Sequence, residues 1–127
     1  ARYVDVVRLG PDRAPVLRAK LAELMEIDKP WLENDLTLAQ LAERIGASSH
    51  HLSQVLNEDL GQTFFDFVNR RRVAEVRRCL ADPAYASQTL LEVALAAGFN
   101  SKAAFNAAFK KYTGITPSQF RASSSPQ

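Results

Sequence analysis

The stretch GFNSKAAFNAAFKKYTGITPSQFR, residues 98–121, contains the clearest local signals in the chain. Phe105 and Phe109 stand four residues apart, and Gly114 follows them. Side chains four residues apart share one face of an α-helix, and glycine commonly ends a helix. The spacing therefore predicts a helix that buries its phenylalanines and ends near Gly114, followed by a short helix from Pro117 to about Arg121.

The same pattern occurs earlier in the chain. Residues 38, 41, 42, 45 and 46 (Leu, Leu, Ala, Ile, Gly) recur 52 positions later as Leu, Val, Ala, Ala, Gly. Residues 52, 56 and 61 (Leu, Leu, Gly) recur 53 positions later as Phe, Phe, Gly. Self-similarity at a nearly constant offset, with the second turn one residue longer, indicates a repeated supersecondary unit. Each copy reads as a helix capped by a hydroxyl residue, a glycine turn and a second capped helix, which is the helix-turn-helix pattern.

The remaining segments connect these two copies. Apolar positions predict a leading helix over about 14–27, with Val16, Leu21, Leu24 and Met25 facing inward, and a long helix over about 63–81 that Pro83 ends. The predicted fold is all-α, with two helix-turn-helix subdomains joined by a long linker helix. The expected organisation is a linker tail over 1–13, a first subdomain over 14–81, a second over 82–121 and a disordered tail over 122–127.

Composition restricts the function classes. The 127 residues are 46% hydrophobic and 24% charged, without an apolar run of the roughly 20 residues needed to span a membrane and without a signal peptide. The single cysteine, Cys79, excludes an internal disulfide. We therefore expect a cytoplasmic protein, and the absence of an initial Met agrees with a chain that begins within a longer one.

Charge is distributed unevenly along the chain. Residues 1–61 hold seven Lys/Arg against ten Asp/Glu, a balance of −3, whereas residues 62–127 hold nine against four, a balance of +5. A basic half favours an acidic partner, most commonly nucleic acid. A helix fits the major groove of B-DNA, and two recognition helices in one chain can read half-sites about one DNA turn, ~34 Å, apart. A helical bundle that binds no DNA remains the alternative.

The quoted stretch resembles the C-terminal signature of the AraC/XylS-type transcription regulators. The segment LTLAQLAERIGASSHHLSQVLNEDLGQTFFDFVNRRR is similar to the first motif of that family, and together the two motifs cover residues 36–121. The resemblance implies a DNA-binding domain that regulates transcription, accompanied by a sensory or oligomerising domain absent from this chain. Residues 14–35 resemble a branch that often carries a membrane-embedded sensor, which leaves open a membrane-anchored full-length protein. Duplex DNA is the expected partner, and RNA polymerase is a second one.

The first motif is expected to read most of the bases. Its exposed face is predicted to present Ser49, His50, Ser53, Gln54 and Asn57 to base edges, and Ser48 to phosphate. Side-chain amides pair bidentately with adenine. The carboxylates Glu58 and Asp59 oppose both the helix dipole and phosphate, so that end is expected to tilt away from the DNA backbone.

The second motif is expected to hold the DNA rather than to read it. Lys102, Ala103, Asn106 and Ala107 are predicted to face the bases, and Ser101, Lys110, Lys111 and Arg70 the phosphates. An alanine methyl can pack on a thymine methyl but cannot form a hydrogen bond with a base edge. The alternative is that these alanines pack against another protein.

Enzyme chemistry is not expected. The sequence offers no Ser/His/Asp set, Gly-rich phosphate loop or metal-ligand cluster, so no cofactor and no metal site are predicted. His50 and His51 are adjacent on a helix and point about 100° apart, without a third ligand nearby. The competing function is a helical protein-interaction module that has lost DNA affinity, a reading supported by the acidic Glu58-Asp59 pair and the alanine-rich second helix.

Overall fold

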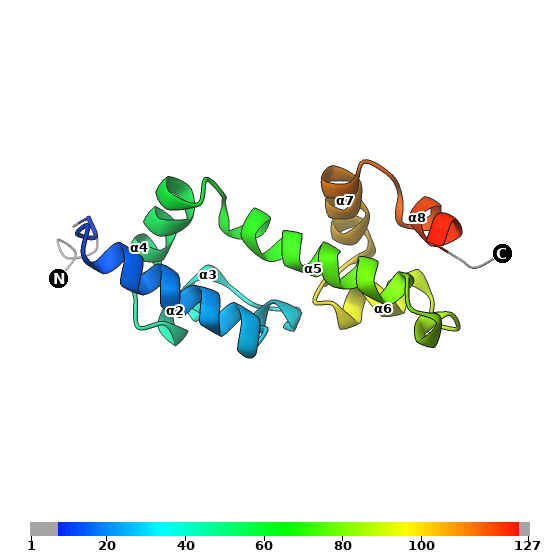
Figure 1. The fold of residues 1–127 in the computed structure, drawn as a ribbon, viewed down its shortest axis with the longest axis horizontal. Helices are drawn as coiled ribbons and strands as arrows, with labels where there is room; N and C mark the ends of the chain where they lie inside the picture. Colours follow the sequence, from blue (N-terminus) through cyan, green and yellow to red (C-terminus); the bar gives the residue numbers. More distant parts are fainter. Residues whose placement is uncertain (1–7, 125–127) are drawn as a thin grey trace. The chain divides into compact units, whose positions relative to one another are not determined.

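Helices make up the architecture of residues 8–124, the part of the chain that the computed structural model describes, and no β-strand occurs among them (Figure 1). The α-helices are α2 (Arg13–Ile27), α3 (Leu38–Arg44), α4 (Ser49–Gln54), α5 (Phe64–Leu80), α6 (Leu90–Ala96), α7 (Lys102–Thr113) and α8 (Pro117–Ser124). The 3₁₀ turns η1 (Pro30–Leu32) and η3 (Pro83–Tyr85) and the π-helical turn η2 (Val55–Asp59) complete them. The prediction of an all-α fold with two helix-turn-helix subdomains and a long connecting helix is confirmed.

Contacts divide the chain into two compact units. The first unit comprises the residues up to Pro30 and Leu36–Phe67, and the second comprises Trp31–Asp35 and the residues from Val68 onward. The stretch 31–35, which the sequence placed within the first subdomain, thus groups with the second, and α5 contributes residues to both units.

Apolar side chains of α2, α3, α4 and η2 form the core of the first unit. Its buried residues include Leu17, Leu21, Met25, Leu41, Ala42, Ile45, Leu52, Val55 and Leu56. The first buried residue of α2 is Leu17, and Val16 is 46% exposed, so the expected inward position of Val16 was wrong. Positions 17, 21 and 25 are spaced by four residues and therefore share one face of the helix.

Aromatic rings dominate the core of the second unit. The ring centroids of Phe99 and Phe105 are 5.5 Å apart, those of Phe105 and Phe109 5.9 Å, and those of Phe109 and Phe120 5.7 Å. Tilted and edge-on pairs at these distances are favourable arrangements of aromatic quadrupoles. Val73 and Val76 of α5 and Val93 and Ala94 of α6 belong to the same cluster.

The two copies of the sequence pattern begin with the same capping device. The Thr37 hydroxyl accepts a hydrogen bond from the Gln40 amide, and the Gln40 side chain accepts one from the Thr37 amide. Thr89 and Glu92 form the same reciprocal pair at the start of α6. This capping box satisfies two backbone donors that a helix start leaves unpaired. The hydrogen bond that the Glu92 carboxylate accepts from the Thr89 backbone amide, helped by one with the Thr89 side chain, lowers the pKa of Glu92.

The second helix of each copy also starts alike. The Ser48 hydroxyl accepts from the His51 amide at the start of α4, and the Ser101 hydroxyl accepts from the Ala104 amide at the start of α7. The turns before these helices carry Gly46 at φ +71° and Gly98 at φ +109°. The repeat inferred from sequence is therefore a repeat of structure.

Two departures from the expected elements are local. The first copy's second helix changes to the π-helical turn η2, in which the Leu60 amide donates to the Val55 carbonyl at 3.2 Å. The last helix α8 continues to Ser124, where a tail was expected from residue 122, and the Ser123 hydroxyl donates to the Phe120 carbonyl within it. Residues 125–127, and residues 1–7 of the expected linker tail, lie outside the described residues.

Candidate nucleic-acid interface

The first candidate recognition element consists of α4 and η2. His50 and Asn57 are exposed on it, while Ser49, Ser53 and Gln54 are half-buried. Arg8, His50, Ser53, Gln54, Asn57 and Glu58 line one hollow of about 230 Å³. The structure thus brings together four of the five side chains that the sequence assigned to base reading, and the Asn57 amide donates to the Ser53 hydroxyl at 3.2 Å.

Gln54 has backbone partners that the sequence did not indicate. Its side-chain oxygen accepts a hydrogen bond from the Leu9 amide at 2.9 Å, and its side-chain nitrogen donates to the Leu9 carbonyl at 3.3 Å. Both functional atoms of the amide are therefore engaged by one residue that lies 45 positions earlier in the chain.

Intrachain arginines pair with the acidic end of this element. Arg8 contacts Glu58 at 2.5 Å and Arg18 contacts Asp59 at 3.1 Å. The hydrogen bond and the charge of Glu58 raise the pKa of Arg8. The carboxylates that sequence analysis treated as repelling phosphate thus have basic partners within the first unit. An unbalanced acidic pair could have suggested such partners, but no periodic pattern identifies which arginines supply them.

The second candidate recognition element is α7. Lys102, Ala103, Asn106, Ala107 and Lys110 are all exposed, whereas Phe105, Ala108 and Phe109 are buried. A helix with one buried and one exposed face presents the exposed one to a partner. The expected small, weakly polar face of α7 is therefore open to solvent, and Ser101 at its start acts as the helix cap.

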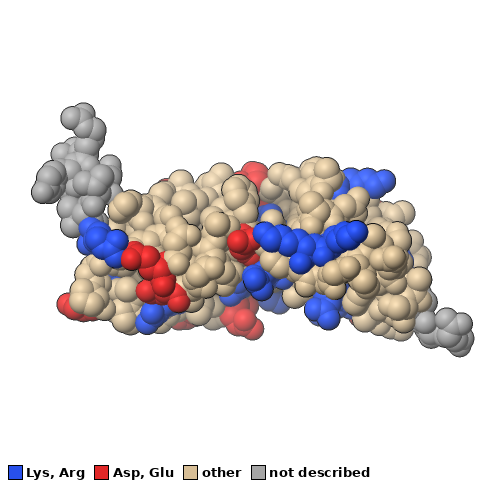
Figure 2. Space-filling view, turned by 90° about the horizontal axis from the view of Figure 1, so that it is seen from above, with Lys and Arg blue, Asp and Glu red and all other residues tan. Residues whose placement is uncertain are grey.

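Most of the arginine side chains of α5 lie over aromatic rings. The Arg70 guanidinium lies 4.9 Å from the centroid of Tyr112, which also has the Lys111 ammonium at 5.4 Å. Arg77 lies 5.7 Å from the centroid of Phe120. Contacts of this kind position a cation over the face of a ring. Figure 2 shows basic side chains over the second unit, and basic and acidic groups side by side on the first.

Arg72 and Arg121 donate hydrogen bonds to backbone carbonyls of the second unit. The Arg72 side chain donates to the carbonyls of Trp31 at 2.7 Å and Glu33 at 2.8 Å, and burial lowers the pKa of its guanidinium. Arg121 donates to the Tyr85 carbonyl at 3.1 Å. These hydrogen bonds fix the two side chains to backbone carbonyls within the second unit.

The histidine pair shows no metal-site geometry. The ring centroids of His50 and His51 are 6.1 Å apart, and residues 8–124 contain no group of three His, Cys, Asp or Glu that could hold a metal ion. No helix in this described part of the chain is long and apolar enough to cross a membrane.

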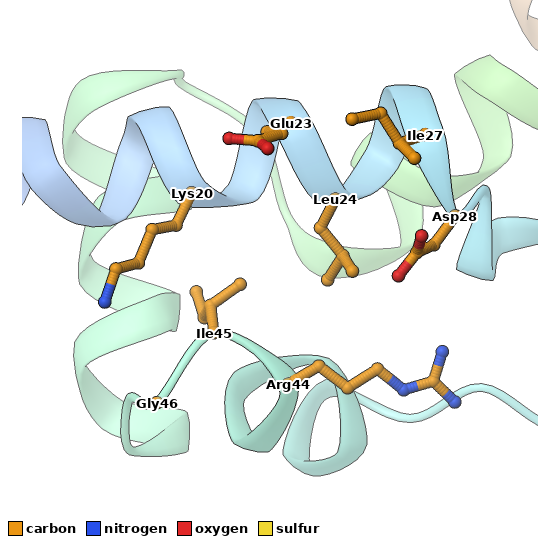
Figure 3. A pocket seen from close by; sticks show the side chains of 8 residues that line it. All are labelled: Lys20, Glu23, Leu24, Ile27, Asp28, Arg44, Ile45 and Gly46. Atoms are coloured by element: carbon orange, nitrogen blue, oxygen red, sulfur yellow. The ribbon is translucent and has the colours of Figure 1, made fainter.

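A larger hollow, of about 460 Å³, lies between α2 and the turn that follows α3 (Figure 3). Leu24 and Ile45 face each other across it, and charged residues of both signs surround them. The lining residues are Lys20, Glu23, Leu24, Ile27, Asp28, Arg44, Ile45 and Gly46. Because this lining mixes apolar side chains with charges of both signs, it does not indicate one chemical class of ligand. None of the site residues predicted from sequence belongs to it.

Comparison with known proteins places this arrangement in a family. Residues 41–123 match the helix-turn-helix domain family. The chain is 39% identical over 102 residues to an uncharacterised HTH-type transcriptional regulator of Staphylococcus aureus (strain COL), in an alignment that covers 80% of this chain and 13% of that protein. The chain therefore spans only a small part of this relative.

Solved structures have the same fold. The C-terminal domain of AraT, a response regulator from Geobacillus stearothermophilus, matches with a TM-score of 0.72 and 25% identity over 89% of this chain and 88% of that one. A transcriptional regulator from Chromobacterium violaceum, described as containing an AraC-type DNA-binding domain, matches with a TM-score of 0.71 and 24% identity over 85% of this chain and 94% of that one. The family match over more than half of its length, with the likeness to the AraT domain, shows that the chain belongs to the AraC-type helix-turn-helix family.

Proposed function

We propose that the chain binds duplex DNA in a sequence-specific way through two recognition elements, α4 with η2 and α7, that enter successive major grooves. In this proposal the chain acts as the DNA-binding part of a transcriptional regulator, the role named for its relatives. Sensing of an effector and contact with RNA polymerase are proposed to involve other parts of the full-length protein, because the chain spans only 13% of its S. aureus relative.

The observation that carries this proposal is the repeated helix-turn-helix with an unburied second helix in each copy. Both copies use the same caps at equivalent positions, and both bury one face of the second helix while His50 and Asn57, or Lys102 and Asn106, stay exposed on the other. A helix-turn-helix contacts DNA through that exposed face of its second helix. Two such faces in one chain favour a DNA site made of two half-sites, one for each face.

Base reading is assigned mainly to the first element. Gln54 and Asn57 carry amides suited to adenine, and His50 and the hydroxyls of Ser49 and Ser53 add further polar groups. The Ser48 hydroxyl, which already caps α4, is assigned to phosphate.

Anchoring is assigned mainly to the second element. Lys102, Lys110, Lys111 and Arg70 supply the positive charge for phosphates, and Ser101 supplies a hydroxyl at the helix start. Ala103 and Ala107 allow close approach and contact with thymine methyl groups, and Asn106 is the one side-chain amide among the residues assigned to this face.

A Gln54→Ala substitution is expected to relax the preference at one base position by about 1–3 kcal/mol, because a bidentate amide contact is lost. Affinity for unrelated DNA should change little, since no charge is removed. Competition binding with duplexes substituted at each position measures this preference. Gln88→Ala, outside both recognition elements, is the matched control, and an unchanged preference in the Gln54 variant would remove Gln54 from the base-reading set.

Protein interaction without DNA binding is the alternative function, and Ile27, 68% exposed beside the larger hollow, is the observation that favours it. The salt dependence of the affinity for duplex DNA distinguishes DNA binding from protein interaction as the function of the chain. Each phosphate neutralised by the chain is expected to contribute about −0.9 to the slope of log K against log salt. A slope near zero on duplex DNA would favour the interaction module.

A further inference from the structure

The backbone of Leu9 occupies the groups with which Gln54 would read a base. The Leu9 amide donates to the Gln54 side-chain oxygen at 2.9 Å, and the Leu9 carbonyl accepts from the side-chain nitrogen at 3.3 Å. Adenine presents the same pair of groups at its major-groove edge, a donor at N6 and an acceptor at N7. One peptide segment of the chain thus offers Gln54 the hydrogen-bonding pattern of an adenine.

The neighbouring residue fixes this segment to the same helical element. Arg8 pairs with Glu58 of η2 at 2.5 Å and lines the same hollow as His50, Ser53 and Asn57. Arg8 therefore borders the same hollow as four of the side chains proposed to face bases, Gln54 included.

The other end of the segment is anchored in the first unit. The Gly10 carbonyl accepts hydrogen bonds from the amides of Arg13 at 3.1 Å and Ala14 at 3.3 Å, which connects the segment directly to α2. Leu17 and Leu21 bury α2 in the core, and the Arg18–Asp59 pair joins it to η2. A segment held at a fixed anchor competes for its site at a high effective concentration.

We propose that residues 8–10 act as an autoinhibitory strap, in which the Leu9 backbone imitates an adenine edge and competes with DNA for Gln54. This inference rests on the proposed function of α4 and η2 as the first recognition element. In the strapped state the first element cannot make its Gln54 contact, while α7 keeps its exposed face. Any change upstream that pulls on residues 8–10 would release Gln54 for base reading.

The strap is weak enough to be displaced. Two neutral hydrogen bonds and an exposed ion pair each contribute modestly in water. Removing one of the hydrogen bonds is therefore expected to raise affinity for the preferred duplex by about three- to tenfold.

The test compares Leu9→Pro with Leu9→Ala in the complete chain. Proline removes the amide donor at residue 9, whereas alanine keeps both backbone groups, and neither changes the charge. Leu9→Pro should bind the preferred duplex about three- to tenfold more tightly than the unchanged chain does, as expected for the loss of one hydrogen bond between the strap and Gln54. Leu9→Ala should bind this duplex with the affinity of the unchanged chain. In a Gln54→Ala background the gain from proline should vanish, because the group that the strap occupies is gone.

Two outcomes would overturn the strap while leaving the proposed function standing, provided that salt-dependent DNA binding is intact. One is an affinity of Leu9→Pro for the duplex that equals that of the unchanged chain. The other is an equal increase in affinity from Leu9→Pro in the Gln54→Ala background. Absence of DNA binding in every version would instead refute the proposed function, and the strap with it. Thermal unfolding checks that the proline variant folds. A measurement without substitution is hydrogen exchange of the Leu9 amide, which should speed up in the complex with DNA, and undiminished protection there would also overturn the strap.

Discussion

Replacing Gly98 by alanine is expected to destabilise the second unit by about 3–5 kcal/mol, the combined cost of a strained backbone and a steric clash. Gly98 has φ +109°, and an added Cβ would lie 2.1 Å from the Trp31 carbonyl oxygen and 2.6 Å from the Arg72 side-chain nitrogen. Those two atoms are joined to each other by a 2.7 Å hydrogen bond, so neither can move without breaking it. Chemical denaturation followed by circular dichroism measures the loss.

Gly46, the equivalent glycine of the first copy, provides the matched control. It also has positive φ, +71°, but no atom lies within 4 Å of an added Cβ. Gly46→Ala should therefore cost only the backbone strain, about 1–2 kcal/mol. Equal losses in the two variants would show that the contact of Gly98 with Trp31 and Arg72 does not hold the turn.

A Phe109→Ala substitution is the second change with a large expected effect, about 3–5 kcal/mol. Phe109 is fully buried, and its ring contacts those of Phe105 and Phe120 with centroids 5.9 and 5.7 Å away. Alanine would remove the ring that connects α7 to α8 and leave a cavity, which adds to the lost transfer free energy. Thermal unfolding with residue-level hydrogen exchange shows whether the loss is confined to the second unit.

Phe65 is the control for this change because it is 70% exposed. Phe65→Ala should alter the free energy of unfolding by less than about 0.5 kcal/mol, as surface substitutions usually do. A Phe109→Ala variant that loses little free energy of unfolding, or a Phe65→Ala variant that loses as much as Phe109→Ala, would contradict the assigned core. Loss of the second unit should also reduce a two-part DNA motif to the half read by the first element.

Much of the fold could be predicted from sequence because its signals are local. The apolar spacing of the two copies, their glycines and their hydroxyl caps are set by neighbours within four residues, and each appears where it was expected. Thr37 and Thr89 form matching capping boxes, and Phe105 and Phe109 are buried. Short-range rules of helix geometry determine all of these features.

The features that sequence reasoning missed depend on contacts between distant residues. Asn34 donates to the Leu95 and Phe99 carbonyls, which ties the stretch 31–35 to the second unit. Leu9 pairs with Gln54 through its backbone, which no side-chain pattern can report. The exposed face of α7 was predicted correctly, but the stacking of Arg70 on Tyr112 requires two helices to be placed in space first.

Selection of binding sites from random duplexes at moderate salt, followed by salt titration of the preferred sequence, tests two-element DNA recognition most directly. The predicted result is a bipartite motif with half-sites about one helical turn, ~34 Å, apart. The half read by α4 and η2 should be the better defined, and binding should weaken steeply with salt. No enriched sequence, or binding that is insensitive to salt, would contradict DNA recognition by these two helices.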